Sequence, residues 1–523
     1  MKTYISLLIV LCLNSICTLS QGQWTEQWVT GIPTTISNGN PPTIKLKPDQ
    51  LNNIYVYVST INSKYTSSSP AFSLFKLDSL GQQQWAKTGN AYITGIVFDQ
   101  SNATYISGIY SGTVNIFGNT LSSNGAKDIY VVKLDPNGNT LWIKSFGGPG
   151  NDESGGLLMS EEQKLVMTGT VRKDPDFVDT LLTTDIRCRP FIGIIDTNGT
   201  VELIKLWDAD LYLTADTSYS RLEFVEPTMD SNGNIYTIWK MTDIVINTEL
   251  GLIYGPPSSW TYQYNLVKFD SLFVVVNVSY LGSDHKQNFY GLKIDRENHP
   301  LLLNSSWSQY SGSGTNILRF DSLLHLNKNF LTPLISNLPY CNYRSKSLSA
   351  MDFDASNNIV TCSYDECNYY GSSPAQQDQH LVIQSFDTSG SQFSFIEYEL
   401  NNKRVFPYDM QFTHNKMNFL VAGYADSTYK FQTDSVGPLS VFVVKYSSNI
   451  TSIRDEQDPS NVSVYPNPSS GNFTISGKSQ NAFTVCVFDV LGNCILDKFP
   501  LKNNEHNIDL SNQAKGIYFV EIV

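Results

Sequence analysis

Apolar and polar residues along the middle of the chain alternate in short phrases that predict paired β-strands. One phrase consists of a β-branched or aromatic strand, an Asp that opens a turn, and a second strand that often carries Trp or another aromatic residue. No sustained apolar period of 3.6 residues accompanies these phrases, so the pattern favours strands over helices. The seven copies begin at Ala71, Asp128, Pro190, Tyr264, Asn316, His380 and Val441.

A second phrase precedes each copy of the first. It has an apolar strand, a polar turn with Asn, Asp or Gly, and another apolar strand, which is the pattern of a β-hairpin. Its copies begin at Ile44, Gly95, Gly156, Pro227, Gly291, Ala350 and Asp409. Two hairpins make four strands, the unit of a β-propeller blade. The sequence therefore predicts an all-β fold, a propeller of seven four-stranded blades over residues 23–450, with the surplus length in loops such as 172–185 and 240–261.

The segment Gln23–Gly31 indicates how the propeller closes. It reads like the last strand of a unit, similar to Leu141–Gly147, yet it stands before the first unit. The last unit fades after Tyr446. An N-terminal strand that completes the final blade would remove the exposed edges of an open ring, so we expect this closure.

Residues 93–160 resemble the bacterial beta-propeller repeat family. They contain its succession of a strand, a turn, a Gly-rich link, Val-Lys-Leu-Asp, Trp and the phrase GGPGNDE. The resemblance is moderate over 44–92 and 190–245 and poor beyond about 280, where the Trp and Gly-Gly signatures are missing. The resemblance implies the same propeller architecture.

The last sixty residues form a separate pattern of short strands and turns. The turn cluster YPNPSSG, a hairpin around VLGN and a closing strand GIYFVEIV predict a small β-sandwich over residues 462–523. The preceding residues 451–461, TSIRDEQDPSN, are polar and charged and contain a Pro, which is typical of a linker.

This ending closely resembles the C-terminal sorting domain that Bacteroidetes bacteria append to cargo of their type IX secretion system. The resemblance implies recognition by the secretion machinery, cleavage within 451–461, and release of the cargo or its attachment to surface lipopolysaccharide. It also implies that the sorting signal depends on particular residues of the folded module, namely Tyr465, Pro466, Asn467, Pro468, Gly471, Gly492, Gly516 and Tyr518.

The N-terminus also predicts export. A short basic start at Lys2 precedes the apolar run Tyr4–Leu13, and small or polar residues follow up to Gly22. This is the pattern of a signal peptide over residues 1–22, too short to span a bilayer as an anchor. No other segment approaches about 18 consecutive apolar residues, so we expect no transmembrane segment and a location outside the cell or on the outer-membrane surface.

The net charge bears on the possible ligands, and the cysteine content bears on what stabilises the fold. The net charge of −13 argues against nucleic acid as a partner, because phosphate binding requires a clustered positive surface. Eight cysteines, two of them in the signal peptide, are too few for a disulfide scaffold. Cys362 and Cys367, in CSYDEC, are the most plausible disulfide pair.

Motifs for chemistry are scarce. The chain has neither His-Glu-x-x-His nor Gly-x-Ser-x-Gly, and no phosphate loop. Turns such as Asp135–Asn139 echo the start of a calcium loop but lack its downstream acidic ligand, and tight hairpins demand the same residues. We therefore expect no cofactor, no metal and no catalytic residues.

Two functions remain open. The first is a secreted or cell-surface scaffold for binding or adhesion, with no enzymatic activity, which would take a glycan or protein ligand. The alternative is an extracellular carbohydrate-active enzyme with its site at the mouth of the propeller channel. Aromatic residues that could stack on a sugar ring are Trp260, Tyr262 and Tyr264, although most propeller aromatics pack between blades.

Overall fold

The computed structural model is all-β, and its described residues contain no helix. None of them therefore forms a helix long and apolar enough to cross a membrane. The chain divides into two units, residues 23–448 and residues 449–523 together with 1–22. The structure describes residues 9–13, 24–33, 43–59, 72–172, 176–177, 180–181, 188–207, 209–211, 221–242, 244–254, 262–283, 287–308, 312–331, 343–368, 377–400, 403, 405–448, 463–466, 469, 471–476, 483–489, 494–501, 505–513, 516 and 518–522.

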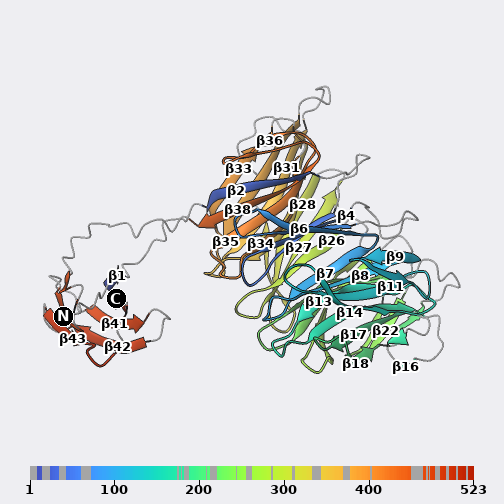
Figure 1. Ribbon diagram of the computed structural model, residues 1–523, viewed down its shortest axis with the longest axis horizontal. Coiled ribbons are helices and arrows are strands. Elements are labelled where there is room, and N and C mark those ends of the chain that lie inside the picture. The colour runs from blue at the N-terminus through green and yellow to red at the C-terminus, as the bar shows by residue number, and fades with distance from the viewer. Residues whose placement is uncertain are drawn as a thin grey trace. The chain divides into compact units, whose positions relative to one another are not determined.

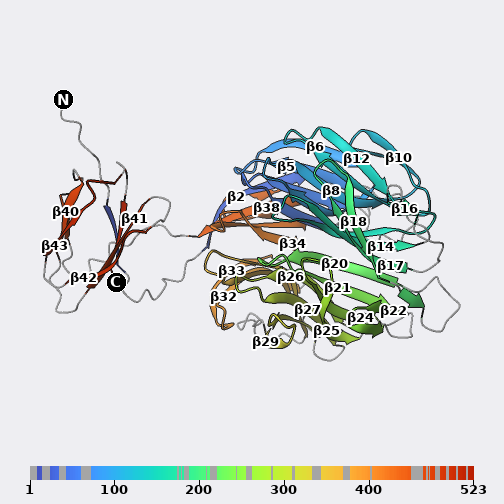
Figure 2. The ribbon, with the colours of Figure 1, turned by 90° about the horizontal axis from the view of Figure 1, so that it is seen from below.

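Seven antiparallel sheets form the blades of a β-propeller in the larger unit (Figures 1 and 2). Blade 1 contains β3 (Thr43–Pro48), β4 (Ile54–Ser59), β5 (Phe72–Leu77) and β6 (Gln83–Gly89). Blade 2 contains β7 (Tyr92–Phe98), β8 (Thr104–Tyr110), β11 (Asp128–Leu134) and β12 (Thr140–Phe146). Blade 3 contains β13 (Glu153–Met159), β14 (Leu165–Arg172), β17 (Cys188–Ile195) and β18 (Val201–Leu206).

The remaining blades follow the same order of strands. Blade 4 contains β20 (Arg221–Met229), β21 (Ile235–Thr242), β24 (Gln263–Phe269) and β25 (Val275–Ser283). Blade 5 contains β26 (Gln287–Ile294), β27 (Pro300–Ser308), β28 (Gly312–Phe320) and β29 (Leu326–Leu331). Blade 6 contains β30 (Tyr343–Phe353), β31 (Ile359–Asn368), β32 (Gln377–Phe386) and β33 (Gln392–Glu399). Blade 7 contains β34 (Val405–Phe412), β35 (Asn418–Ala425), β38 (Ser440–Ser448) and β2 (Trp24–Pro33).

Short additional strands lie in the connections between these. The hairpin β9 (Thr113–Ile116) and β10 (Asn119–Ser122) extends the sheet of blade 1 to six strands. The others are β15 (Asp176–Phe177), β16 (Thr180–Leu181), β19 (Ala209–Leu211), β22 (Ile244–Thr248), β23 (Gly251–Tyr254), β36 (Tyr429–Lys430) and β37 (Ser435–Val436).

The expected closure of the ring is confirmed, because β2 forms the fourth strand of blade 7. It pairs antiparallel with β38, from Trp24 opposite Ser448 to Pro33 opposite Ser440. A buried carboxylate on β2 anchors it further: Glu26 accepts hydrogen bonds from Tyr398 Oη at 2.7 Å and from Thr433 N at 2.6 Å. The N-terminal strand thus completes the last blade of the chain.

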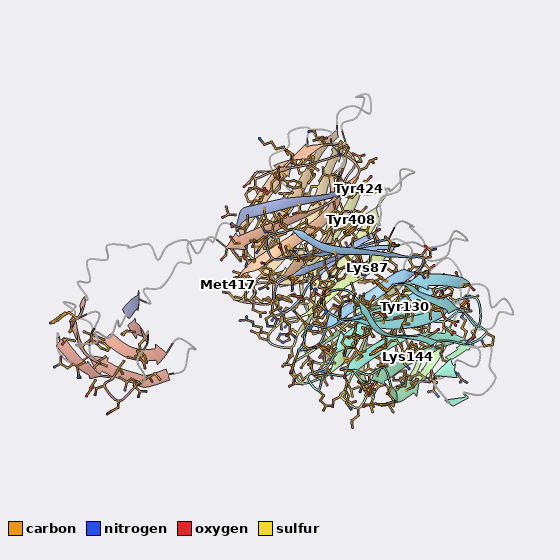
Figure 3. The ribbon with its side chains drawn as sticks, viewed as in Figure 1. Lys87, Tyr130, Lys144, Tyr408, Met417 and Tyr424 are labelled. Carbon is orange, nitrogen blue, oxygen red and sulfur yellow. The ribbon has the colours of Figure 1, made fainter. Side chains whose placement is uncertain are left out.

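Each pair of neighbouring blades shares one hydrophobic cluster. Tyr130, for example, lies in the cluster between blades 1 and 2, and Tyr408 and Tyr424 lie in the cluster between blades 7 and 1 (Figure 3). Burying one large apolar side chain contributes about 1.5–3 kcal/mol. The closing interface is therefore built from the same kind of contact as the others.

A polar contact accompanies each of three of these clusters. Lys76 Nζ in β5 and Trp85 Nε1 in β6 both donate to the carbonyl oxygen of Pro136, at 2.7 and 3.3 Å. Lys76 and Trp85 belong to blade 1, whereas Pro136 is in the second turn of blade 2. We call this arrangement the Lys–Trp clamp. In it, a Lys and a Trp of one blade both donate hydrogen bonds to one turn carbonyl of the next blade.

The Lys–Trp clamp recurs at equivalent positions, with separations of 3.0 to 3.3 Å. The two other copies are Lys133 and Trp142 on Thr197 O, and Lys445 and Trp28 on Ser79 O. The latter copy joins blade 7 to blade 1, so the ring closes with the contact that joins blade 1 to blade 2.

The clamp explains which residue each receiving turn needs. Gly138 has φ of +83°, and a Cβ there would lie 3.0 Å from the indole of Trp85. Only glycine combines this backbone conformation with so close a ring. In blade 4 the equivalent residue is Phe273, with φ of +59° and its side chain in the core, and the preceding blade offers Leu203 instead of Trp. In blade 4, where no indole covers the turn, the large side chain of Phe273 fills the gap.

The smaller unit contains two sheets, as a small sandwich requires. One sheet consists of β39 (Ser463–Tyr465), β40 (Asn472–Ser476) and β43 (Glu505–Asp509), and the other of β1 (Ile9–Leu13), β44 (Tyr518–Ile522), β41 (Phe483–Asp489) and β42 (Cys494–Leu501). Phe473, Ile475, Val487, Ile508 and Val520 from both sheets are buried. β1 pairs parallel with β44. The signal peptide at 1–22 stays a prediction, and the expected linker at 451–461 lies outside the described residues.

We expect Trp28→Ala to lower the free energy of unfolding by about 2 kcal/mol, because it removes a half-buried indole and one donor of the closing clamp. Urea unfolding of the full chain followed by far-UV circular dichroism measures this. Trp85→Ala is the matched control, since it removes the equivalent side chain between blades 1 and 2, and it should cost about the same. A neutral Trp28→Ala beside a destabilising Trp85→Ala would show that closure does not depend on the clamp.

Candidate functional site at the propeller axis

The first strand of each sheet is the one nearest the propeller axis, and these seven inner strands follow one another around it. Each ends at a turn of the same hydrogen-bonding pattern. The residue two positions before the turn occupies an equivalent place in every blade. These seven residues are Lys47, Val97, Leu158, Thr228, Lys293, Asp352 and Gln411. Blades 2 to 4 place uncharged side chains there, whereas blades 5, 6, 7 and 1 place charged groups or an amide.

Two buried carboxylates join these inner strands. Asp352 Oδ2 accepts a hydrogen bond from the backbone N–H of Phe412 in the next blade at 2.8 Å. Asp409 Oδ2 in turn accepts from Leu46 N–H in blade 1 at 2.9 Å. An inner strand is a sheet edge with backbone donors that lack a ladder partner. Asp352 and Asp409 satisfy two of these donors and hold blades 6, 7 and 1 together.

Two lysines reach towards the same place. Lys416 Nζ lies 3.3 Å from Asp352 Oδ1, and Lys293 Nζ donates to Gln411 Oε1 at 2.9 Å, from blade 5 to blade 7. Burial opposes ionisation of Asp352, but Lys293, Lys416 and backbone N–H groups outweigh it, so the pKa of Asp352 lies below its usual value. Asp352 is therefore charged at neutral pH.

Lys47 completes this set, which we call the axial cluster: Lys47, Lys293, Asp352, Asp409, Gln411 and Lys416. The side chain of Lys47 is exposed to solvent, although many protein atoms surround it near the axis. Partial desolvation by these atoms and the neighbouring Lys293 and Lys416 lower the pKa of Lys47 to about 8, against the opposing effect of Asp352 and Asp409. At neutral pH this ammonium is charged, yet it loses its proton more readily than an ordinary lysine. The axial cluster can thus bind an anion or exchange a proton.

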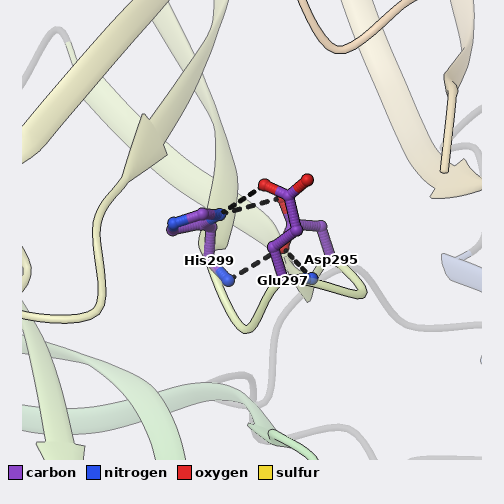
Figure 4. Close-up of side chains that lie close together, drawn as sticks. All are labelled: Asp295, Glu297 and His299. Atoms are coloured by element: carbon purple, nitrogen blue, oxygen red, sulfur yellow. Dashed lines mark hydrogen bonds and ion pairs between the residues drawn. The ribbon is translucent and has the colours of Figure 1, made fainter.

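A second cluster lies at the first turn of blade 5 (Figure 4). One oxygen or nitrogen atom each from Asp295, Glu297 and His299 lies within 4.8 Å of the others, a spacing that could hold a metal ion. Arg319 takes that place instead: its Nη2 lies 2.6 Å from Asp295 Oδ2, 2.9 Å from Glu297 Oε2 and 2.9 Å from His299 Nδ1. Because Arg only donates, His299 must accept at Nδ1. We interpret this cluster as a fixed ion-pair network and not as a metal centre.

The aromatic residues expected to stack on a ligand are placed differently. Tyr264 is buried in the cluster between blades 4 and 5, with its ring centroid 5.1 Å from that of Phe289. Tyr262 packs against the same cluster and lies under Lys240 Nζ, 4.2 Å from its ring centroid. Tyr264 therefore has no ring face for a sugar, and Trp260 lies outside the described residues.

The expected disulfide is not formed in this structure. Cys362 and Cys367 both belong to the continuous strand β31 rather than to the two sides of a turn. Cys362 is a free, buried cysteine that packs in the cluster between blades 6 and 7. Five positions along an extended strand separate two residues by much more than the about 6 Å that a disulfide allows between Cα atoms.

The residues expected to carry the sorting signal lie partly within the described chain. Tyr518 is buried in β44, whereas Tyr465 is 44% exposed and precedes Pro466 through a cis peptide bond. Gly471 has φ of +114°, and a Cβ there would lie 2.8 Å from the Ser511 backbone. Gly516 is also described, whereas Asn467, Pro468 and Gly492 lie outside the described residues. Their role in recognition stays a prediction.

Another pair of carboxylates is buried where blade 2 connects to blade 3, in the GGPGNDE phrase. Asp152 accepts hydrogen bonds from Arg172 N and Gly148 N, each at 2.7 Å. Asp128 Oδ1 has no hydrogen-bond partner among the described residues, and it approaches the same point beside Gly147 as Asp152 Oδ2 does. Burial raises the pKa of Asp152 to about 7, and the nearby Asp128 adds to this. Burial likewise raises the pKa of Asp128.

Residues 463–523 match the family described as the secretion system C-terminal sorting domain. The tail is a type IX sorting domain. The protein is therefore exported to the cell surface or beyond, as expected from its ending.

Comparison with curated proteins found an endo-acting ulvan lyase of Formosa agariphila, 41% identical over 66 residues. The match covers 12% of this chain and 12% of that enzyme. The chain thus spans only a small part of the relative's length.

Among solved structures, an ulvan lyase bound to a sugar ligand matches 75% of this chain and 93% of its own, at 11% identity and a TM-score of 0.43. A sialidase from Streptococcus pneumoniae matches 80% and 70%, at 11% identity and a TM-score of 0.37. At such values neither likeness by itself gives this chain the activity of those enzymes.

The comparisons contradict the expectation that the protein has no enzymatic activity. The curated relative is an endo-acting ulvan lyase, matched over 12% of this chain. That expectation rested on the lack of sequence motifs for catalysis. Such motifs identify sites that lie within one segment, and a propeller can assemble a site from separate blades.

The axial cluster was missed for the same reason. Its members come from blades 1, 5, 6 and 7, and no single segment of the sequence contains them all. One sequence signal could have indicated the cluster. Lys47, Lys293 and Asp352 are charged residues at a repeat position, whereas the equivalent residues of blades 2 and 3, Val97 and Leu158, are apolar.

We expect the free energy of unfolding to fall by up to about 4 kcal/mol as the pH rises from about 4 to about 7, because Asp152 binds its proton more tightly in the folded than in the unfolded chain. This stabilisation is complete below the unfolded pKa and is lost through the folded one. Asp128→Asn should reduce the fall, since it removes one carboxylate and offers a donor to Asp152. Urea unfolding across this pH range measures it.

Glu161→Gln, at an exposed turn position, is the control and should follow the wild-type profile. An identical pH profile for Asp128→Asn and the wild type would show that the carboxylate pair does not store a proton.

Proposed function

We propose that the propeller is a carbohydrate-active enzyme that acts on a polysaccharide outside the cell, with the axial cluster as its active site. The observation that carries this proposal is the convergence of lysines and carboxylates from four blades at one end of the inner strands. The export of the protein by its sorting tail places such an enzyme where polysaccharide substrates are found.

Acid–base chemistry is the capability that the axial cluster offers. Cleavage of a glycosidic bond, by hydrolysis or by elimination, requires one group to take a proton and another to give one. Lys47, with its pKa of about 8, can serve in either form near neutral pH. Asp352 stays ionised beside Lys416 and can stabilise positive charge or orient the ammonium groups.

The name of the curated relative supports the same reaction class. That protein is an endo-acting lyase of a polysaccharide, although the matched segment covers an eighth of it. The resemblance of the blades to bacterial beta-propeller repeats, and of the tail to that of Bacteroidetes cargo, agrees with a secreted bacterial enzyme of this kind. We infer a glycan as the principal ligand.

The expected result is that the purified chain depolymerises at least one polysaccharide of a panel. New reducing ends measure cleavage of any kind, and the ultraviolet absorbance of a newly formed double bond distinguishes elimination from hydrolysis. Lys47→Met should lower kcat by about 100-fold or more, as the loss of a general acid or base does. Lys430→Met, an exposed lysine on β36 away from the inner strands, is the control and should keep full activity.

If the purified chain cleaves no polysaccharide in a panel of neutral, carboxylated and sulfated chains, the proposal is contradicted. Full activity in Lys47→Met would also contradict it, because it would place the active site elsewhere.

For the tail, we propose that the secretion machinery cleaves the chain within residues 451–461 at the cell surface and thereby removes the sorting domain. The propeller is then released or joined to lipopolysaccharide. We expect the surface form to lack the C-terminal GIYFVEIV and the propeller to stay folded without it, because the propeller unit has buried hydrophobic clusters of its own. Mass spectrometry of the surface protein tests this. A mature protein that still ends in Val523 would contradict it.

A further inference from the structure

The ammonium group of Lys47 is the uncommitted member of the axial cluster. Lys293 donates to Gln411, and Lys416 pairs with Asp352. Lys47 Nζ makes no hydrogen bond or ion pair with any residue that the structure describes. The side chain of Lys47 is exposed, so a ligand in solvent can reach its ammonium group.

The two carboxylates of the axial cluster are not free to serve Lys47. Asp352 already accepts from Phe412 N, from Phe353 N at 2.9 Å, and from Lys416. Asp409 accepts from Leu46 N and, at 2.9 Å, from Met410 N. The backbone donors fix both carboxylates in place, so neither can move towards Lys47 without leaving a buried N–H unpaired.

The balance of charge in the axial cluster is positive. Three lysines face two carboxylates there, whereas the whole chain carries a net charge of −13. The mutual repulsion of Lys47, Lys293 and Lys416 disfavours the cluster when it is empty. An anion at this point would relieve the repulsion and give Lys47 a partner.

We infer that the axial cluster binds an anionic group of a polysaccharide, a carboxylate or a sulfate ester, and that Lys47 is its principal contact. This inference rests on the proposed function for the identity of the ligand as a polysaccharide. It specifies the substrate class: chains of acidic sugars bind, and neutral chains do not bind at this point. Lys293 and Lys416 supply the surrounding positive potential while they keep their own partners.

Binding of soluble polyanions to the full chain tests the inference without requiring catalysis. The probes are polygalacturonate for carboxylate, dextran sulfate for sulfate, and dextran as the neutral control, in affinity electrophoresis or calorimetry. We expect binding of at least one polyanion and none of dextran. Lys47→Met should weaken the binding by about tenfold or more, which is the effect of losing one charge-assisted hydrogen bond. Lys430→Met should bind as the wild type does.

The pH dependence gives a second, independent readout. Affinity for the polyanion should fall as the pH rises through about 8, because Lys47 then loses its proton in the free protein. Lys47→Arg should keep the affinity and remove this fall, since a guanidinium stays charged. The charged groups that face Lys47 are Asp352, Asp409, Lys293 and Lys416.

The outcomes separate this inference from the proposed function. Binding of polyanions that depends on Lys47, without cleavage of any polysaccharide, would support the anion site and contradict the enzyme. Cleavage of neutral polysaccharides only, with no binding of either polyanion, would support the enzyme and overturn the anion site. Equal binding by the wild type and Lys47→Met would also overturn it, because the polyanion would then bind elsewhere.

Discussion

One turn carbonyl that receives two donors from the neighbouring blade is the contact that joins blade 7 to blade 1, blade 1 to blade 2 and blade 2 to blade 3. A four-stranded sheet of this length cannot bury both of its faces alone, so each blade must be held against the next. Hydrophobic packing supplies most of the attraction but does not fix the rotation of one blade relative to another. The carbonyl oxygen of Pro136, which accepts from Lys76 and Trp85, adds a directional contact to this packing. The same contact joins blade 7 to blade 1, where Glu26 adds hydrogen bonds of its own.

The repeated blades leave one position on the inner strands, that of Lys47 and its equivalents, where the residue type can vary. The inner strands need partners for their edge N–H groups, and Asp352 and Asp409 supply them in blades 6 and 7. Blades 2 to 4 have apolar or uncharged side chains at the equivalent of Lys47, so neither packing nor the turns require a charge there. Residues that the scaffold does not constrain are free to serve a ligand. The axial cluster therefore lies where structural demands are weakest and several blades are near one another.

Much of the fold could be predicted from the sequence because it is repeated. Asp turns between strands and the likeness of Trp28 to Trp142 were enough to give the blade, its number of copies and the closing strand. The axial cluster could not be predicted, because Lys47 and Lys293 are brought together only by the ring. Tyr264 looked like a surface residue after a long loop, but it falls on the strand position that packs between blades. The carboxyl of Asp152 lies in a connection between blades, and nothing in the sequence indicated that it is buried beside Asp128.

The pairing of β2 with β38 also governs the order in which the propeller can form. Trp24 lies opposite Ser448, so the first strand of the domain has no partner until nearly the whole domain has been synthesised and translocated. Contacts of such sequence separation form slowly, because the intervening chain must first be brought together. Until then the chain has an unpaired strand at one end and an incomplete last blade at the other. A protein of this design therefore stays in an unfinished state until its last blade has formed, and only then does the ring close.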